Sequence, residues 1–351
     1  MIDQPVTNTP TTALVILNYN GKHYLEKFLP SVIQYSTGDT LLVVGDNSST
    51  DDSVLFLQNY YPSVRVISLD KNYGFAEGYN LVLKQIKTDY YFLLNSDVEL
   101  RSSWTPLIEI IHSNPRLAAA QPKILSYAQP TVFEHAGAAG GWLDILGYPF
   151  CKGRIFDVIE KDVKQYDRQN GIFWASGAAM IIRASIFHQI GGFDKDYFAH
   201  MEEIDWCWRA KRCGWNIISI PEVSVFHVGG GTLPYHSDQK IFLNFRNNLA
   251  TIFKNDSILN LIYKLPIRFI LDGAAAFSFL IKKNPKGFLA VVRAYLHFIK
   301  WIPALHSKRK KINQLSKGTT FSPEGLFKGS ILIEYFIKGH QTFQSIVSSH
   351  D

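Results

Sequence analysis

The 351-residue sequence predicts an α/β fold built on a mostly parallel sheet with helices on both faces. Short apolar runs rich in Val, Ile and Leu alternate with stretches of helical periodicity through residues 13–100. Each apolar run ends in a cluster of Asn, Asp, Ser or Gly, which is typical of a strand that reaches a loop. Hydrophobic residues form 46% of the chain, which is enough for a core and excludes a disordered or collagen-like protein.

Each element of the first half is expected for a local reason. Apolar runs that stop at turn residues predict strands at residues 13–17, 41–44, 64–69 and 90–94. Apolar residues at helical spacing, or acids at a helix start, predict helices at residues 24–32, 51–57 and 76–87. Strands that alternate with helices in this way run parallel, so their carboxyl ends meet at one edge of the sheet.

The polar clusters that follow the four strands are predicted to meet at that edge. They are Asn18-Tyr19-Asn20, Asp46-Asn47-Ser48, residues 70–74 and Asn95-Ser96-Asp97. Turn chemistry accounts for any one cluster, but four in succession indicate a binding site, because open α/β sheets bind ligands beyond the strand ends.

The residue types at this edge suit a nucleotide and its phosphates. Asp46 is placed to accept hydrogen bonds from a base or a ribose. Gly74 allows close backbone approach, and a helix that begins near Ala76 would offer its N-terminal amides to a phosphate. Asp97 could hold Mg²⁺ or Mn²⁺ together with substrate phosphates. The sequence contains neither GxGxxG nor GxxxxGK[ST], which argues against dinucleotide and P-loop sites.

Residues 15–20, 44–51, 72–76 and 94–97, in this order and spacing, resemble the family 2 inverting glycosyltransferases. More narrowly, they resemble the bacterial rhamnosyltransferase-like branch, over roughly residues 13–250. The resemblance implies a GT-A fold, a dTDP- or UDP-linked sugar donor and a DxD metal motif. Asn95 replaces the first Asp of that motif, and Asp97 keeps the metal-binding position. The residues expected to bind the nucleotide-sugar are Asn18, Tyr19, Asn20, Asp46, Asn47, Asn72, Gly74, Phe75, Asn95, Ser96 and Asp97.

Three acids within four residues, Glu202, Glu203 and Asp205, precede the apolar residues of a predicted helix. One interpretation is that they only stabilise the N-terminus of that helix. The resemblance implies a catalytic role, since the family motif Glu-Asp-x-Asp supplies the base with its second acid. By position that base is Glu203, with Glu202 as the second candidate. Asp205 is expected either to orient the segment, paired with Arg209, or to bind the acceptor.

Small residues ahead of a predicted strand at 178–182 let a sugar approach the backbone. The resemblance places this segment, with Trp174, Ser176 and Gly177, on the acceptor side of the site. His227 ends a β-rich run and is open to two interpretations, a structural histidine or, by the resemblance, a ligand of the metal or diphosphate.

Two further segments carry a recognisable pattern. The Gly-rich residues 133–142 are expected to form a structural turn. Residues 245–248, Phe-Arg-Asn-Asn, resemble a family element that packs on the core and reaches the phosphates.

The net charge of +6 is unevenly distributed along the chain. Residues 1–253 hold 21 Lys and Arg against 25 Asp and Glu, whereas residues 254–351 hold 15 against 5, a net +10. We expect a flexible N-terminus at 1–12 without a signal peptide, a GT-A domain at 13–253 and a basic, amphipathic helical region at 254–351. Three scattered cysteines favour a reducing compartment.

The basic region is expected to lie on an anionic membrane, because charges interrupt every apolar stretch long enough to span one. The residues expected to contact lipid are Phe269, Phe277, Phe279, Phe288, Tyr295 and Trp301, together with the cluster Lys308-Arg309-Lys310-Lys311. The alternative is that the region packs on its own protein or on a second subunit of a homodimer. Nucleic acid is not expected, since no known binding motif accompanies the charge.

Together these features predict an inverting transferase that moves one sugar, rhamnose in the branch it resembles, to a lipid-linked or polysaccharide acceptor. Its expected location is the cytoplasm, peripherally attached to the inner face of the plasma membrane. One alternative is a sugar-1-phosphate nucleotidyltransferase, but the first strand lacks the Gly-rich basic loop which that class requires. A non-catalytic scaffold is the other alternative, and the retention of Asp97 with Glu202 and Glu203 speaks against it.

Overall fold

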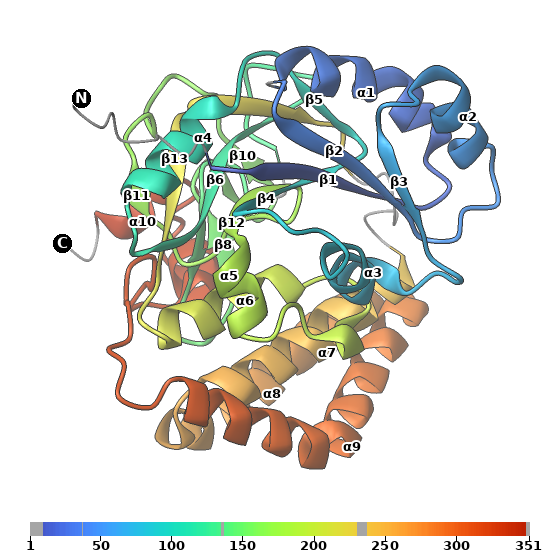
Figure 1. Ribbon diagram of the computed structural model, residues 1–351. Coiled ribbons are helices and arrows are strands. Elements are labelled where there is room, and N and C mark those ends of the chain that lie inside the picture. The colour runs from blue at the N-terminus through green and yellow to red at the C-terminus, as the bar shows by residue number, and fades with distance from the viewer. Residues whose placement is uncertain (1–9, 37, 135–136, 230–236, 349–351) are drawn as a thin grey trace.

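The computed structural model describes residues 10–36, 38–134, 137–229 and 237–348, and its central sheet carries helices on both faces (Figure 1). Four strands form the parallel part in the order β3-β2-β1-β4. They are β1 (Thr12–Asn18), β2 (Thr40–Asp46), β3 (Arg65–Ser68) and β4 (Tyr90–Asn95). The predicted fold class is therefore confirmed, and all four strands lie where the sequence pattern predicts them.

The rest of the central sheet is mixed. β12 (Ala179–Arg183) runs antiparallel between β4 and β6 (Leu117–Ser126), and β13 (Asn216–His227) runs parallel to β6. β13 also pairs antiparallel with β5 (Val98–Leu100) and β11 (Asn170–Gly171). A second, four-stranded sheet holds β7 (Gly141–Leu143), β8 (Pro149–Cys151), β9 (Arg154–Ile155) and β10 (Val158–Ile159). His135 and Ala136 of the Gly-rich segment lie outside the described residues, as do residues 1–9 and 230–236.

Side chains that alternate along β1 build two cores, one on each face of the sheet. Leu14 and Ile16 belong to the core under α1 (Lys22–Tyr35), α2 (Ser53–Tyr60) and α4 (Thr105–Ser113). Ala13 and Val15 belong to the core under α3 (Gly74–Leu83), α5 (Ala184–Gln189) and α6 (Glu202–Arg212). A sheet buried on both faces explains why its strands read as continuous apolar runs.

Helix α3 ends earlier than the predicted 76–87. The amides of Gln85 and Ile86 donate to the carbonyls of Val82 and Leu83, three residues back, at 3.0 and 3.1 Å. This tighter turn ends the α-helical pattern at Leu83 and leads the chain into β4.

Three long helices form a separate layer, α7 (Asp238–Asn255), α8 (Ile258–Ile281) and α9 (Pro285–Leu315), drawn in orange in the lower part of Figure 1. Helix α7 runs through residue 253, where the sequence suggested a boundary. Beyond α9 the chain returns to the body, where Leu326 bridges to Leu143 and Phe343 of α10 (Phe343–Val347) packs against Trp142. Much of the basic region therefore packs on its own protein.

The structure corrects the list of residues predicted to contact a membrane. Phe269 and Phe277 are exposed, but Phe279, Phe288, Tyr295 and Trp301 pack against the cores. In the basic cluster, Lys308 pairs with Asp196 at 2.7 Å, and buried Arg309 donates to the Phe253 carbonyl. Within the described ranges one helix, α9, is long and apolar enough to cross a membrane by length and composition.

Candidate active site

The polar clusters after the parallel strands do meet at one edge. Asn18 and Asp46 are partners in the register of β1 and β2, and the Asp46 carboxylate accepts a hydrogen bond from Asn18 Nδ2 at 3.3 Å. Asp46 also accepts from the amide of Ser49 at 3.0 Å and is 3% exposed. The Asn95 amide donates to the carbonyl of Ala178, which brings the start of β12 to the same edge.

Asn47 and Asn72 hold the loop before α3. Asn47 Nδ2 donates to Asn72 Oδ1 at 3.0 Å and to the Gly74 carbonyl at 2.9 Å. Asn47 Oδ1 accepts from the amide of Tyr73, and Asn72 Oδ1 from the amide of Gly74. These two side chains therefore shape the predicted nucleotide site through the loop they fasten.

Asn20 has a similar role on the neighbouring loop. Its Oδ1 accepts from the amides of Thr50 at 2.7 Å and Asp51 at 3.3 Å, and its φ of 51° places it in the left-handed region that Asn tolerates. Tyr19, just before it, is 42% exposed at the sheet edge. A solvent-facing ring beside buried Asp46 is suited to cover a nucleobase.

The N-terminus of α3 is not open to a phosphate as the sequence suggested. The amides of Phe75 and Ala76 both donate to the carbonyl of Phe198, at 2.6 and 3.1 Å. Gly74 has a φ of +75°, and a Cβ there would lie 2.5 Å from the ring and the carbonyl oxygen of Phe198. The glycine is needed for close packing against residue 198, and the amides already have a partner.

Asp97 and His227 lie together because β13 pairs with β5, which puts His227 opposite Val98. His227 Nε2 is 3.1 Å from Asp97 Oδ1, and His227 Nδ1 is 3.0 Å from Glu134 Oε2. Burial alone would lower the pKa of His227, but the hydrogen bonds and charges of Asp97 and Glu134 outweigh it and raise that pKa to about 10. Asn95 Nδ2 is 3.4 Å from the same Nε2.

These side chains fit a divalent ion that a diphosphate helps to hold. A carboxylate and an imidazole are both ligands of Mn²⁺-type sites, and Glu134 orients the imidazole from the far side. Among the described residues no group of three or more His, Cys, Asp or Glu is arranged to hold a metal ion by itself. An ion here would therefore take its remaining ligands from substrate phosphates and water, as Mg²⁺ commonly does.

Glu203 has the properties of a general base. Its Oε2 is buried and has no hydrogen-bond partner among the described residues. Burial raises the pKa of Glu203 to about 7, although the main-chain amides of Glu203 and Ile204 donate to the carboxylate and oppose the shift. A carboxylate with one oxygen held and a pKa near neutrality is suited to accept a proton from a hydroxyl.

Glu202 is less suited to that role. It is 4% exposed, and burial together with the charge of Glu203 raises the pKa of Glu202 well above its ordinary value. This shift disfavours the ionised form that a base needs. His200 Nε2, Glu202 Oε2 and Glu203 Oε2 are all buried, and none has a hydrogen-bond partner in the described ranges. Such a concentration of unpaired polar atoms is typical of a ligand site.

The predicted acceptor-side segment reaches the base at Gly177. A Cβ on Gly177 would lie 3.1 Å from the Phe75 ring and 3.9 Å from Glu203 Cβ. Ser176 is turned inward, since its amide donates to Gln121 and its Oγ accepts from the Ala178 amide. Trp174 is buried, and its indole N–H donates to the Trp142 carbonyl at 2.9 Å. Gly177 is thus the member of the segment that faces the base, while Ser176 and Trp174 support it.

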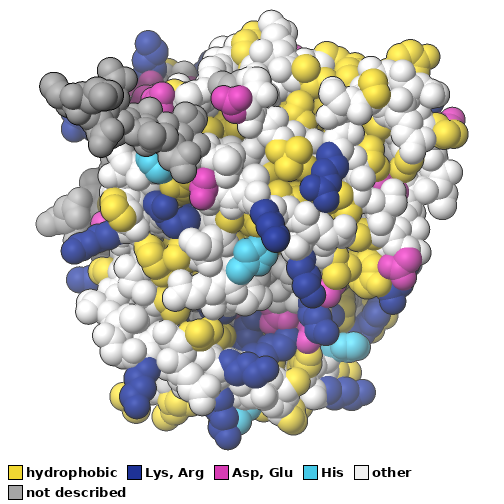
Figure 2. Space-filling model, in the orientation of Figure 1, with side chains coloured by type: hydrophobic (Ala, Val, Ile, Leu, Met, Phe, Trp, Pro, Cys, Tyr) yellow, Lys and Arg dark blue, Asp and Glu magenta, His cyan; other side chains and the backbone are white. Residues whose placement is uncertain are grey.

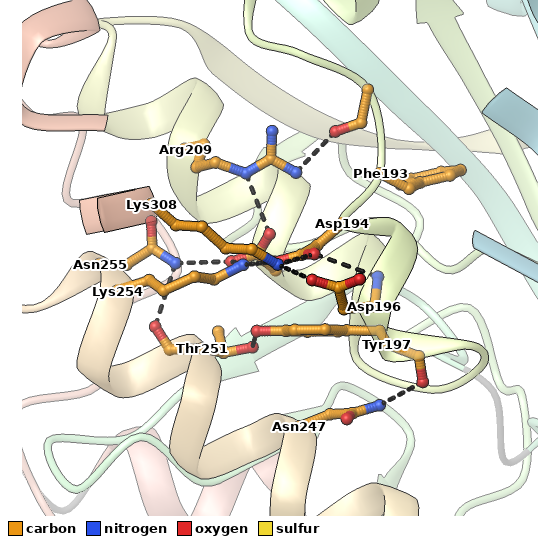
Figure 3. A network of polar contacts seen from close by, with 12 residues as sticks. Phe193, Asp194, Asp196, Tyr197, Arg209, Asn247, Thr251, Lys254, Asn255 and Lys308 are labelled. Carbon is orange, nitrogen blue, oxygen red and sulfur yellow. Dashed lines mark hydrogen bonds and ion pairs between the residues drawn. The ribbon is translucent and has the colours of Figure 1, made fainter. Parts of the chain in front are cut away.

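Asp205 has the orienting role, one of its two predicted roles. Its carboxylate is fully buried and binds Arg209 at 3.0 Å, Lys254 at 2.9 Å and Asn255 at 2.8 Å. Figure 3 shows this network, in which residues of α6, α7 and α9 meet the segment around Asp194. A carboxylate with these partners does not reach an acceptor.

Asn247 holds the segment that precedes the acids, a role that the prediction for residues 245–248 did not include. This fully buried side chain donates from Nδ2 to the carbonyls of Tyr197, Ala199 and His200, at 3.1, 3.0 and 2.8 Å. The segment it holds has positive φ at three non-glycine residues, Phe198, His200 and Met201. Strained backbone persists where its surroundings hold it, and here it leads directly into Glu202 and Glu203.

A family model described as glycosyl transferase family 2 matches residues 13–191 of the chain. The chain belongs to glycosyl transferase family 2. The predicted recognition and the prediction of a glycosyltransferase are therefore confirmed, and the two alternatives raised from the sequence receive no support.

Curated relatives place this family 2 transferase in the rhamnosyltransferase-like branch. It is 26% identical over 240 residues to the N-acetylglucosaminyl-diphospho-decaprenol L-rhamnosyltransferase of Mycobacterium tuberculosis, covering 62% of this chain and 76% of the relative. It is 24% identical to the rhamnosyltransferase WbbL of Escherichia coli K12, over 69% of this chain and 90% of WbbL. The chain is also 23% identical to the low-salt glycan biosynthesis hexosyltransferase Agl10 of Haloferax volcanii, over 82% of this chain and 90% of Agl10.

Solved glycosyltransferases share the fold of this family 2 transferase. TarS of S. aureus, in complex with UDP-GlcNAc, superposes with a TM-score of 0.54 at 15% identity, over 87% of this chain and 89% of that chain. The mannosyltransferase PcManGT of Pyrobaculum calidifontis, in complex with GDP-Man and Mn²⁺, has a TM-score of 0.51 at 14% identity, over 88% and 85%. The predicted GT-A fold is confirmed by these likenesses.

Proposed function

We propose that this family 2 transferase moves one sugar, rhamnose or a related hexose, from a nucleoside diphosphate to a lipid-linked or polysaccharide acceptor, with inversion. The proposal depends above all on one observation: Glu203, whose Cβ faces Gly177, has a buried Oε2 without a hydrogen-bond partner in the part of the chain that the structure describes. The names of the relatives, which include two rhamnosyltransferases, support the sugar and the glycan context.

In this mechanism Glu203 removes the proton from the acceptor hydroxyl while its oxygen attacks the anomeric carbon of the donor sugar. A bond forms between that oxygen and the anomeric carbon, and the bond from the anomeric carbon to the diphosphate oxygen breaks on the opposite face. The electron pair leaves with the nucleoside diphosphate. Asp46 and Tyr19 bind the nucleoside, dTDP or UDP, at the sheet edge.

Asp97 and His227 are the proposed ligands of Mg²⁺ or Mn²⁺, and Asn95 and Ser96 line the diphosphate beside them. Bound there, the ion supplies positive charge that offsets the charge developing on the leaving diphosphate. Two structural neighbours were solved with Mn²⁺, which supports a divalent metal for this fold.

The proposed location is the cytoplasmic side of the cell envelope, where nucleotide-sugars and lipid-linked acceptors meet. Peripheral attachment through the C-terminal helices is part of this proposal. It is supported by the relative whose name gives a decaprenol-linked acceptor.

The test compares Glu203→Gln and Asp97→Ala with Glu222→Gln, an exposed acid far along β13 from His227. Transfer is measured with dTDP- and UDP-sugars and a polyprenyl-diphosphate sugar acceptor, and donor binding by thermal stabilisation. We expect Glu203→Gln to keep donor binding and to lose transfer by about 10²- to 10⁴-fold. Asp97→Ala should lose the metal-dependent part of donor binding. Full transfer in both variants would overturn the proposal.

A further inference from the structure

Helix α8 has the reverse of the polarity expected for a surface helix in water. Its charged residues Lys264, Arg268 and Asp272 are buried, with Arg268 and Asp272 each 1% exposed. Most of its large apolar residues face outward instead. The exposed ones are Ile258, Leu259, Ile262, Tyr263, Ile267, Phe269, Ile270, Phe277, Leu280 and Ile281.

The buried charges hold the helix in this orientation. Arg268 donates to Asn248 Oδ1 at 2.6 Å and to Asp272 at 3.2–3.3 Å. Asp272 also accepts from the hydroxyls of Tyr148 and Tyr295, at 2.7 and 2.8 Å. Rotating α8 to hide its apolar face would separate Arg268 from Asn248, and Asp272 from Tyr148 and Tyr295. The pair would then lose its neutral partners, so the polar network determines the outward direction of the apolar residues.

The apolar face continues onto α9 and is bordered by cations. Leu289, Val292, Leu296 and Ile299 of α9 are exposed. Lys282, Lys283 and Lys286, at the turn between the two helices, are also exposed. Asp272 is the only acid in residues 257–317, and it is buried. In Figure 2, several Lys and Arg side chains lie over the lower part of the molecule, where Figure 1 has α7, α8 and α9.

We propose that this face, defined as the exposed apolar residues of α8 and α9 with Lys282, Lys283 and Lys286, docks on an anionic lipid bilayer. Apolar side chains enter the boundary between headgroups and acyl chains, and the lysines pair with lipid phosphates. A second copy of the chain is the poorer occupant, since two such faces would bring lysines against lysines with no exposed acid to offset them.

The face differs from the one predicted from sequence, because it depends on Ile262, Ile270 and Ile281 rather than on the cluster around Lys308. It deepens the proposed function by naming the surface that presents the enzyme to a lipid-linked acceptor. Vesicle binding needs neither donor nor acceptor, so it is measured separately from the proposed reaction.

The experiment is vesicle flotation of the full chain with two kinds of vesicle, phosphatidylethanolamine with phosphatidylglycerol, and phosphatidylcholine alone. The apolar variant is Ile262→Ser/Ile270→Ser/Phe277→Ser. Its matched control replaces exposed apolar residues of the body, Leu55→Ser/Tyr60→Ser/Val163→Ser. The cation variant is Lys282→Gln/Lys283→Gln/Lys286→Gln, with Lys84→Gln/Lys87→Gln/Lys164→Gln as its control.

We expect the unmodified chain and both controls to float with anionic vesicles, more weakly as salt rises. The apolar variant should lose at least tenfold in binding, and the cation variant roughly fivefold per lysine at low salt. Melting temperature and transfer to a water-soluble acceptor should not change, which separates lost docking from lost folding. Equal flotation of the apolar variant and its control would overturn the proposal. The proposal would also be overturned if the unmodified chain formed a stable dimer that does not float, and if the apolar variant were a monomer.

Discussion

The ammonium group of Lys254 lies 2.9 Å from Oδ1 of Asp205, and both side chains are buried. Asp205 stands on α6 two residues after Glu203, and Lys254 stands on α7. Lys254 also pairs with Asp194, which in turn pairs with Lys308 of α9 (Figure 3). The helix that carries the proposed base is thereby tied to the C-terminal helical layer.

Lys254→Met should destabilise the protein strongly, because it leaves the carboxylates of Asp205 and Asp194 buried with one cation fewer. Breaking a buried ion pair by removing one partner costs about 3–5 kcal/mol. Chemical denaturation measures the loss, with the exposed Lys84→Met as control. A change in the free energy of unfolding below about 0.5 kcal/mol would show that the pair does not hold α6 and α7 together.

Asn247 is predicted to position the base through the main chain of residues 197–200. Its Oδ1 accepts from Arg246, which directs Nδ2 toward the three carbonyls. Asn247→Ala removes this donor from the carbonyls of Ala199 and His200, at a cost of about 1–3 kcal/mol for each buried group. The Tyr197 carbonyl keeps the Ala199 amide and Arg246 as donors. Asn247→Asp should be at least as harmful, since it sets a carboxylate oxygen against carbonyl oxygens.

The prediction for Asn247 is checked by measuring kcat and the donor KM of both variants. Asn59→Asp, at an exposed position, is the control. We expect kcat to fall by about 10- to 100-fold with the donor KM little changed. If Asn247→Asp were milder than Asn247→Ala, the side chain would act by filling space rather than by donating.

The pH dependence of transfer should report Glu203, whose pKa burial raises to about 7. The base works in its ionised form, so kcat/KM should be constant above about pH 8 and fall about tenfold per pH unit well below 7. Glu202→Gln should leave this limb in place, because burial and the charge of Glu203 already disfavour the ionised form of Glu202. A kcat/KM that stays constant from pH 5 to 9, measured at pH values at which the protein remains folded, would exclude Glu203 as the base.

Two glycines should respond in opposite directions to alanine. Gly74→Ala puts a side chain at a φ of +75° and 2.5 Å from Phe198, so we expect a loss of stability above about 1–2 kcal/mol together with lower transfer. Gly273→Ala, inside α8 with open space around its Cβ, should stabilise by about 0.5–1 kcal/mol. Thermal unfolding compares the two, and equal effects would show that contact with Phe198 does not constrain Gly74.

Much of the fold and part of the site could be predicted from the sequence. Strands buried on both faces appear as apolar runs, and each run ends where a polar cluster begins, so Asn18, Asp46 and Asp97 could be assigned to one sheet edge. The pairing of His227 with Asp97 could be expected only through the family resemblance, since it depends on how β13 meets β5.

Other roles could not be predicted, because hydrogen-bond partners far along the chain decide them. Asn72 and Asn47 look like free ligands in the sequence, but they bind each other. The amides at the start of α3 look free, but the Phe198 carbonyl occupies them. Glu134 lies in a segment predicted to be a structural turn, but it binds the imidazole of His227.

The sequence by itself determined the alternation of strands and helices, the edge of the sheet at which the polar clusters meet and the acids among which a base is proposed. These features follow from local periodicity and residue type. Only the tertiary structure decided which buried polar atoms lack a partner among the described residues, such as Glu203 Oε2, and which are held, such as the carboxylate of Asp205. It also decided which face of α8 is outermost, because Arg268 and Asp272 find their partners on other elements and leave the apolar residues to face outward.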